Sequence, residues 1–173
     1  GHGFSAQIVS IPENDKGLKA GDIVTCNPYF NCGSCYACQK GLVNACTDNQ
    51  TMGVQRDGAF CEYIRMPVSR IIPGKGLTAR QLALIEPFAI SQHAISRCPV
   101  KAGDKLLVTG AGPIGLFALL AAKVKGAEVT VSDVLAGRLE MAKAFGADHV
   151  VNATDPDAAQ QLRDLTGGNG FDV

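Results

Sequence analysis

The spacing of apolar positions changes character about halfway along the chain. In the first half, apolar segments are short and are separated by glycine and proline turns, as in residues 4–11, 18–25, 58–66 and 70–73. Short apolar segments set between such turn residues are typical of strands in a β-barrel or a β-sandwich. We therefore predict that the first half of the chain is a β-rich unit.

The second half alternates between compact apolar runs and segments with apolar residues at helical spacing. Thr78 and Gln81 are placed as in the capping box that begins a helix, and a further helix is predicted over 86–97. The remaining predicted elements are strands at 105–109 and 128–132, helices at 113–125 and 138–145, and strands that start near 150 and 171. This alternation indicates a parallel sheet with right-handed crossovers, so the predicted fold class is α/β.

Composition excludes several function classes. The 173 residues are 46% hydrophobic, which suits one or two domains, and we divide them into 1–88 and 89–173. The 16 Lys and Arg residues balance the 16 Asp and Glu residues, so charge favours neither nucleic acid nor an anionic membrane as a partner. The longest apolar run, 114–122, is too short to span a bilayer. Seven cysteines without a visible secretory signal favour the reducing cytoplasm and metal binding over disulfides.

Four of the cysteines lie within fifteen residues in the pattern C-x2-C-x2-C-x7-C, namely Cys32, Cys35, Cys38 and Cys46. Four thiolates at this spacing can surround zinc, and such a closed site is structural because no position is left for substrate. A disulfide cluster is the main alternative, although half-cystines two residues apart cannot pair without strain. An iron–sulfur cluster also remains open. The other cysteines, Cys26, Cys61 and Cys98, are interpreted as small buried apolar residues.

A glycine-rich turn, Gly110-Ala-Gly112-Pro113-Ile114-Gly115, follows one predicted strand and begins the next predicted helix. In that setting the pattern is the fingerprint of a Rossmann dinucleotide-binding domain. The first glycine permits the tight turn, the second lets the backbone approach a pyrophosphate, and the third lets the helix pack on the strand. Amide groups at the helix N-terminus then face the phosphates. The alternative is a doubly wound domain whose turn holds no ligand.

Asp133 stands eighteen residues after Gly115, at the end of the second predicted strand of this unit. A carboxylate at that place accepts hydrogen bonds from the adenosine ribose hydroxyls. Because it would repel a 2′-phosphate, we predict NAD rather than NADP as the cofactor. Arg138 lies near enough either to weaken that preference or to pack against the adenine. The alternative role for Asp133 is a helix N-cap.

A cysteine loop followed about 65 residues later by a glycine turn resembles the zinc-dependent medium-chain dehydrogenases, which include alcohol, sorbitol, threonine and sugar-acid dehydrogenases. Other segments that resemble the family are Gly1–Phe4, Gly21–Val24, Gly58–Tyr63, Glu86-Pro87 and Gly146–Asp148. The resemblance implies that 1–88 is most of a GroES-like β-barrel domain and that 89–173 is the first part of a Rossmann NAD-binding domain. Since the chain has no initiator Met and stops in a predicted strand, we expect it to be a piece of a longer protein.

The resemblance also implies a second, catalytic zinc that has His2 and Glu86 among its ligands and polarises a carbinol oxygen before hydride transfer. The sequence departs from the family in two ways. The family's Cys ligand lies upstream of the matching segment, and Gly3 replaces a Glu that lies beside the zinc. The alternatives are that His2 is the remnant of an expression tag and that Glu86 is a first-turn acid favoured by the helix dipole.

The resemblance therefore implies a cytoplasmic, homo-oligomeric (dimeric or tetrameric) oxidoreductase that moves a hydride between a secondary alcohol and NAD. The expected substrate class, a polyol or a sugar acid, rests on Glu86-Pro87 and is an association rather than a derivation. One alternative is a non-catalytic piece that binds zinc and nucleotide. The other is a quinone or enoyl reductase of the same superfamily, which needs no catalytic zinc.

Overall fold

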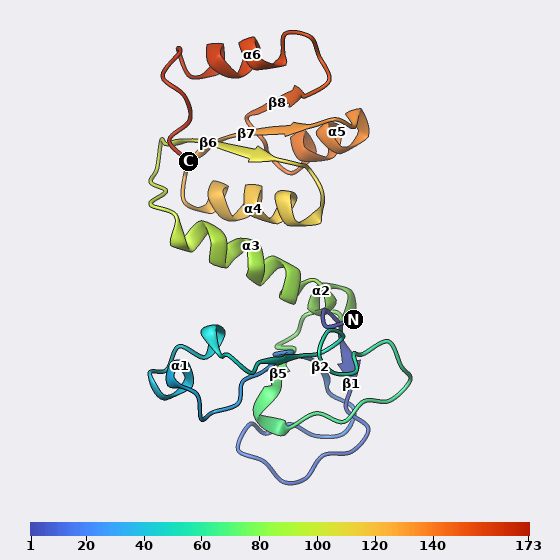
Figure 1. The fold of residues 1–173 in the computed structure, drawn as a ribbon. Coiled ribbons are helices and arrows are strands. Elements are labelled where there is room, and N and C mark those ends of the chain that lie inside the picture. The colour runs from blue at the N-terminus through green and yellow to red at the C-terminus, as the bar shows by residue number, and fades with distance from the viewer. The chain divides into compact units, whose positions relative to one another are not determined.

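The first unit, Gly1–Glu86 in the computed structural model of residues 1–173, consists of short antiparallel strands and irregular turns (Figure 1). Its strands are β1 (Ala6–Gln7), β2 (Ile23–Cys26), β3 (Tyr29–Phe30), β4 (Gln50–Thr51) and β5 (Ile71–Pro73). Strand β2 lies between β1 and β5, and β3 pairs with β4. The short helical elements are α1 (Tyr36–Gln39), η1 (Val43–Ala45), η2 (Val68–Arg70) and α2 (Ala79–Ala83). Ile8, Leu18 and Val24 form the buried apolar cluster of this unit.

The second unit, Pro87–Val173, contains a parallel sheet in the order β6-β7-β8 (Figure 1). The strands are β6 (Lys105–Thr109), β7 (Glu128–Asp133) and β8 (His149–Asn152). The helices are α4 (Pro113–Val124), α5 (Ala136–Ala144) and α6 (Ala158–Leu165), and α3 (Ile85–Arg97) begins just before the boundary between the units. Five of the six β7 residues are buried, as expected for the central strand of a parallel sheet. Leu119 and Ala122 of α4 are fully buried in the core against β6 and β7.

The last residues of the chain form backbone hydrogen bonds with β6, the edge strand of this sheet. Leu107 N donates to Val173 O at 2.9 Å, and Asp172 N donates to Lys105 O at 2.8 Å. These hydrogen bonds place 172–173 on the side of β6 opposite to β7, but the strand predicted to start near 171 does not form within residues 171–173. Later segments of the chain therefore lie on both sides of β6, as they do at the point where the strand order of a doubly wound sheet reverses. In open α/β sheets, ligands bind at such a point, outside the carboxyl ends of the strands.

The structure corrects three expectations for the first unit. Only Ala6–Gln7 of the predicted strand 4–11 is a strand, and 58–66 contains none. A strand needs a neighbouring strand to pair with, and 58–66 pairs with no strand of residues 1–173, although Ala59 N donates to Gly1 O at 2.8 Å. Phe60 is therefore fully exposed, and Cys61, predicted to be buried, is exposed as well.

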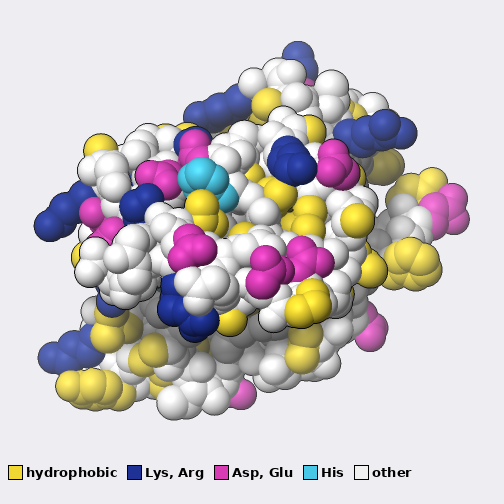
Figure 2. Space-filling model, turned by 90° about the horizontal axis from the view of Figure 1, so that it is seen from above, with side chains coloured by type: hydrophobic (Ala, Val, Ile, Leu, Met, Phe, Trp, Pro, Cys, Tyr) yellow, Lys and Arg dark blue, Asp and Glu magenta, His cyan; other side chains and the backbone are white.

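Charged side chains of both signs lie interspersed on the face shown in Figure 2, with apolar side chains between them. This agrees with the formal net charge of zero. None of the helices combines the length and the apolar content that crossing a membrane requires.

Glu128, at the start of β7, gives a prediction for the pH dependence of stability. Lys105 Nζ donates to Glu128 Oε1 at 2.8 Å, and this hydrogen bond is the main cause of the lowered pKa of the Glu128 carboxyl. Because the folded pKa lies below the unfolded one, the stabilisation is present above about pH 4 and is lost as the pH falls through the folded pKa. We expect Glu128→Gln to lower the unfolding free energy by less than about 1 kcal/mol at neutral pH, because water screens this one-third-exposed pair. Urea unfolding of the parent and of Glu128→Gln at neutral and at acidic pH measures the difference in their unfolding free energy. If that difference is the same at both pH values, the stabilisation does not come from the ionised Glu128 carboxylate.

Candidate metal and dinucleotide sites

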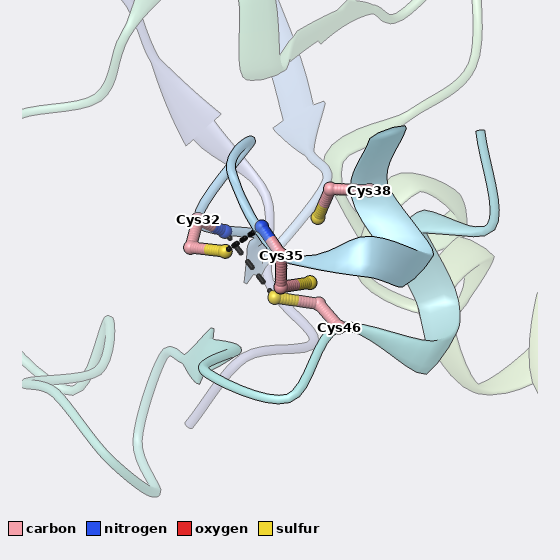
Figure 3. Close-up of side chains that lie close together, drawn as sticks. All are labelled: Cys32, Cys35, Cys38 and Cys46. Atoms are coloured by element: carbon pink, nitrogen blue, oxygen red, sulfur yellow. Dashed lines mark hydrogen bonds between the residues drawn. The ribbon is translucent and has the colours of Figure 1, made fainter. Parts of the chain in front are cut away.

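The four cysteines predicted to bind metal converge in the first unit (Figure 3). Their sulfur atoms all lie within 4.8 Å of one another. Cys32, Cys35, Cys38 and Cys46 are all partly buried and unpaired, so the disulfide alternative is not what the structure contains. Four convergent sulfurs are the donor set that tetrahedral zinc sites use, and the residues present therefore fit a closed metal site.

Local backbone geometry brings the sulfurs together. Gly33 and Gly41 have φ values of 78° and 76°, in the left-handed region, so the chain can turn tightly on both sides of α1. Cys32 N donates to Cys46 Sγ at 3.3 Å, and Cys35 N donates to Cys32 Sγ at 3.3 Å. Backbone N–H groups directed at sulfur favour the thiolate form that binds metal.

The pKa values of these thiols separate widely when no cation is present. The N–H groups of Cys38 and Thr47 lower the pKa of Cys35 to about 6. The Cys32 N–H also lowers the pKa of Cys46, but this effect is outweighed. Burial and the nearby Cys32 and Cys38 thiols raise the pKa of Cys46 to about 11. Four sulfurs this close repel one another as thiolates, and a divalent cation removes that repulsion.

His2 and Glu86, predicted to be catalytic zinc ligands, also lie together in the first unit. His2 Nε2 is 3.5 Å from Glu86 Oε1, and the side chain of Glu86 is only 12% exposed. Tyr29 OH, which sequence reasoning missed, donates to Glu86 Oε1 at 3.1 Å. Burial, followed by the Glu86 carboxylate, raises the pKa of Tyr29. Two candidate ligands are fewer than the three protein ligands of a catalytic zinc, so residues 1–173 do not complete this site.

The predicted dinucleotide turn lies between β6 and α4. Gly110 has a φ of 94°, which favours glycine, and a Cβ on Gly112 would meet no protein atom within 4 Å. Gly112 is also the N-cap of α4 and offers no side chain to the free N–H groups of the first turn. With Pro113, Ile114 and Gly115, these glycines form one edge of a cavity of about 490 Å³, whose other lining is mostly apolar residues of β6, together with Ile95 and Val173. An open cradle at a helix N-terminus fits a pyrophosphate.

Gly115→Ala is expected to disrupt this turn. A Cβ on Gly115 would collide with the carbonyl oxygen of Gly110, whereas a Cβ on Gly137 in α5 meets no atom within 4 Å. We expect Gly115→Ala to destabilise the protein by roughly 1–3 kcal/mol through overpacking. The control Gly137→Ala should stabilise it by roughly 0.5–1 kcal/mol. Thermal unfolding of both variants measures the contrast, and equal behaviour would show that the turn tolerates a side chain.

Asp133 ends β7 with its carboxylate directed at the glycine turn. Its Oδ2 accepts from Ala111 N at 2.7 Å and its Oδ1 accepts from Leu135 N at 2.9 Å. These N–H groups, Ala111 first, lower the pKa of Asp133, so the carboxyl is ionised at neutral pH. The N-cap of α5 is Leu135, so Asp133 is not the N-cap. Arg138 Nη1 lies 3.8 Å from Asp133 Oδ2 on a half-exposed side chain.

Sequence reasoning also missed the contact between Asp133 and the turn. The Asp133 carboxylate fixes the amide of Ala111 inside the Gly110–Gly115 loop, in addition to any contact with a ribose. The eighteen-residue spacing from Gly115 predicted that Asp133 lies near the turn. Only the structure shows that the ends of β6 and β7 pair side by side, which brings a carboxylate oxygen of Asp133 to the loop.

The two units match two family models. Residues 1–76 match the alcohol dehydrogenase GroES-like domain, and residues 113–173 match the zinc-binding dehydrogenase domain. A GroES-like unit with a four-cysteine cluster, followed by a Rossmann-type unit, defines the class of zinc-binding dehydrogenases. The chain belongs to the zinc-dependent medium-chain alcohol dehydrogenase family. This confirms the predicted family and fold class.

Similar proteins include the L-galactonate-5-dehydrogenase of Escherichia coli K12, which is 40% identical over 169 residues, 98% of this chain and 50% of the relative. One similar structure is an E. coli CFT073 alcohol dehydrogenase complexed with cofactor NADH, with TM-score 0.86 and 32% identity over 96% of this chain and 50% of that chain. Another is a zinc-binding dehydrogenase of Sinorhizobium meliloti bound to NADP, with TM-score 0.86 and 31% identity over 98% of this chain and 49% of that chain. The chain thus spans about half the length of the relatives it matches.

Proposed function

We propose that the protein is a zinc-dependent oxidoreductase that transfers a hydride between a secondary alcohol, a polyol or sugar acid, and NAD. In this proposal, residues 1–88 are the GroES-like zinc-binding catalytic domain and residues 89–173 are the Rossmann NAD-binding domain. The observation that carries it is the four-sulfur cluster on the same chain as the open glycine turn. The name of the E. coli relative, an L-galactonate dehydrogenase, supports the sugar-acid class.

The residues of this chain would bind and orient the cofactor. The first-turn amides of α4 bind the pyrophosphate, and Gly112 leaves room for its approach. Asp133 accepts hydrogen bonds from the ribose hydroxyls and fixes the loop through Ala111. The exposed Arg138 side chain has room to lie over the adenine. When bound, the nicotinamide ring supplies the hydride acceptor or donor.

Cys32, Cys35, Cys38 and Cys46 would hold a structural zinc and take no part in the hydride step. For a catalytic zinc, His2 and Glu86 would supply two ligands, with the third from outside these residues. Tyr29 would then fix one oxygen of Glu86 by its hydrogen bond.

The proposal is tested on the full-length protein by metal analysis and by NADH formation with a panel of polyols and sugar acids. Two zinc ions per chain and NAD reduction that depends on an added alcohol are expected. One zinc ion per chain with reduction of quinones or enoyl compounds would support the reductase alternative. Zinc and NAD binding without any turnover would support the non-catalytic alternative. Light scattering of the same sample tests the predicted dimer or tetramer.

A further inference from the structure

A chain of polar contacts connects Arg70 to the cysteine cluster. Arg70 Nη2 donates to Asn31 Oδ1 at 2.6 Å, and Asn31 Nδ2 lies 3.6 Å from Cys38 Sγ. Asn31 directly precedes Cys32, while Arg70 ends η2, thirty-nine residues later. Both side chains are partly buried. Two segments that are distant in the sequence therefore meet at one of the four sulfurs.

The chemistry of the donors fixes the direction of this chain. A guanidinium can only donate hydrogen bonds, so the side chain of Asn31 must present its oxygen to Arg70. The amide nitrogen of Asn31 then faces Cys38, where it acts as a donor to sulfur. A metal-bound thiolate sulfur accepts such a hydrogen bond better than a neutral thiol does, so this amide is placed to orient a metal-bound Cys38.

The backbone that carries Arg70 is held in place. Lys16 Nζ donates to three carbonyl oxygens of this turn, those of Val68, Ser69 and Ile71, at 2.9, 3.0 and 2.7 Å. Asn27 N donates to the carbonyl oxygen of Arg70 itself at 2.9 Å. The guanidinium therefore extends toward Asn31 from a fixed turn rather than from a free loop.

Charge explains why a cation at this place matters. Zinc held by four thiolates carries a formal charge of about −2. Arg70 is the cationic side chain that hydrogen bonds connect to this centre, through Asn31. A second arginine, Arg56, lies 4.0 Å above the ring of Phe30, and Arg70 lies 5.5 Å from the same ring. Only Arg70 also reaches Asn31, so Arg56 is its matched control.

We propose that Asn31 and Arg70 are positioning residues of the four-cysteine site, which orient the Cys38 thiolate and offset the charge of the metal-loaded cluster. This inference rests on the proposed structural zinc. Contacts that orient metal ligands typically change metal affinity by about 10–100-fold. The arrangement therefore predicts an effect on metal retention rather than on hydride transfer.

The test measures zinc release to a chromogenic chelator from the parent, Asn31→Ala and Arg70→Gln, with Asn44→Ala and Arg56→Gln as controls. Asn44 lies on η1 in the same loop and is exposed. We expect zinc to leave Asn31→Ala and Arg70→Gln about tenfold faster or more. The double variant should add little, because the two residues act through one contact. The cobalt-substituted parent and Asn31→Ala should also differ in their thiolate-to-metal absorption bands.

The outcomes separate the two proposals. A parent that binds no zinc would overturn the metal site itself. A zinc-bound parent whose Asn31→Ala and Arg70→Gln variants release zinc at the rate of the controls would overturn the positioning role and leave the metal site intact. If Arg70→Gln fails to fold, Asn31→Ala alone decides, and Asn31→Gln tests whether a longer amide restores retention.

Discussion

With the proposed zinc at the four-cysteine site, Cys46→Ser is expected to remove the metal from the first unit and to lower its stability strongly. The sulfur of Cys46 lies within 4.8 Å of the other three, so its loss leaves an incomplete ligand set. Metal binding by such sites is worth on the order of 10 kcal/mol of folding free energy. The apolar core of the first unit is small: its buried cluster consists of Ile8, Leu18 and Val24, and the other buried apolar side chains of this unit are Cys26, Met52 and Leu82. We expect a loss of roughly 3 kcal/mol or more, which is about 6–12 °C in Tm.

The control for this prediction is Cys61→Ser. Cys61 is exposed and lies outside the four-sulfur cluster, so its replacement should leave zinc content and unfolding unchanged. Thermal unfolding with and without a chelator completes the experiment. Chelator should lower the Tm of the parent and of Cys61→Ser to nearly that of Cys46→Ser. If the chelator leaves the Tm of the parent unchanged, the result would contradict the prediction that a bound metal stabilises the first unit.

The second unit could be predicted closely from the sequence because its signals are local. The strand 105–109 has the predicted bounds, and the helix predicted at 113–125 spans Pro113–Val124. A local signal in the first unit is also confirmed: in the capping box at Thr78, Thr78 Oγ1 accepts from Gln81 N and Gln81 Oε1 accepts from Thr78 N. Apolar runs, caps and glycine turns depend on neighbours in the sequence, so they can be read without the fold.

The first unit and parts of the sites could not be predicted, because they depend on distant partners. Segment 58–66 has weak strand character, yet whether it pairs depends on a neighbouring strand. The contact of Tyr29 with Glu86 joins residues fifty-seven positions apart. The contact of Arg70 with Asn31 joins residues thirty-nine positions apart. Spacing predicted that the four cysteine sulfurs converge because these residues are close in the sequence, but no spacing rule reveals the polar contacts around them.

Asp133→Ala is expected to weaken NAD binding by about 10–100-fold. The variant removes a carboxylate that would bind the ribose hydroxyls, and hydrogen bonds to charged groups are worth about 1.5–3 kcal/mol. It also frees the Ala111 amide and so loosens the glycine turn. NADP binding should fall less, because the charge that repels its 2′-phosphate is gone. The preference for NAD over NADP should therefore drop by about tenfold or more.

Asp133→Asn separates the two roles of this side chain. An asparagine retains an oxygen that can accept from Ala111 N but loses the negative charge, so the turn should stay ordered while the NAD preference falls. Asp155→Ala is the matched control, since Asp155 is exposed and its carboxylate makes no hydrogen bond or ion pair within the chain. Titrations with NAD, NADP and ADP-ribose measure the affinities of all three variants. ADP-ribose shares the adenosine ribose and the pyrophosphate with NAD but lacks the nicotinamide. The Asp133 variants should therefore lose affinity for ADP-ribose in parallel with their loss of affinity for NAD. An unchanged NAD to NADP ratio in both Asp133 variants would remove Asp133 from the ribose site and leave it the role of fixing the turn.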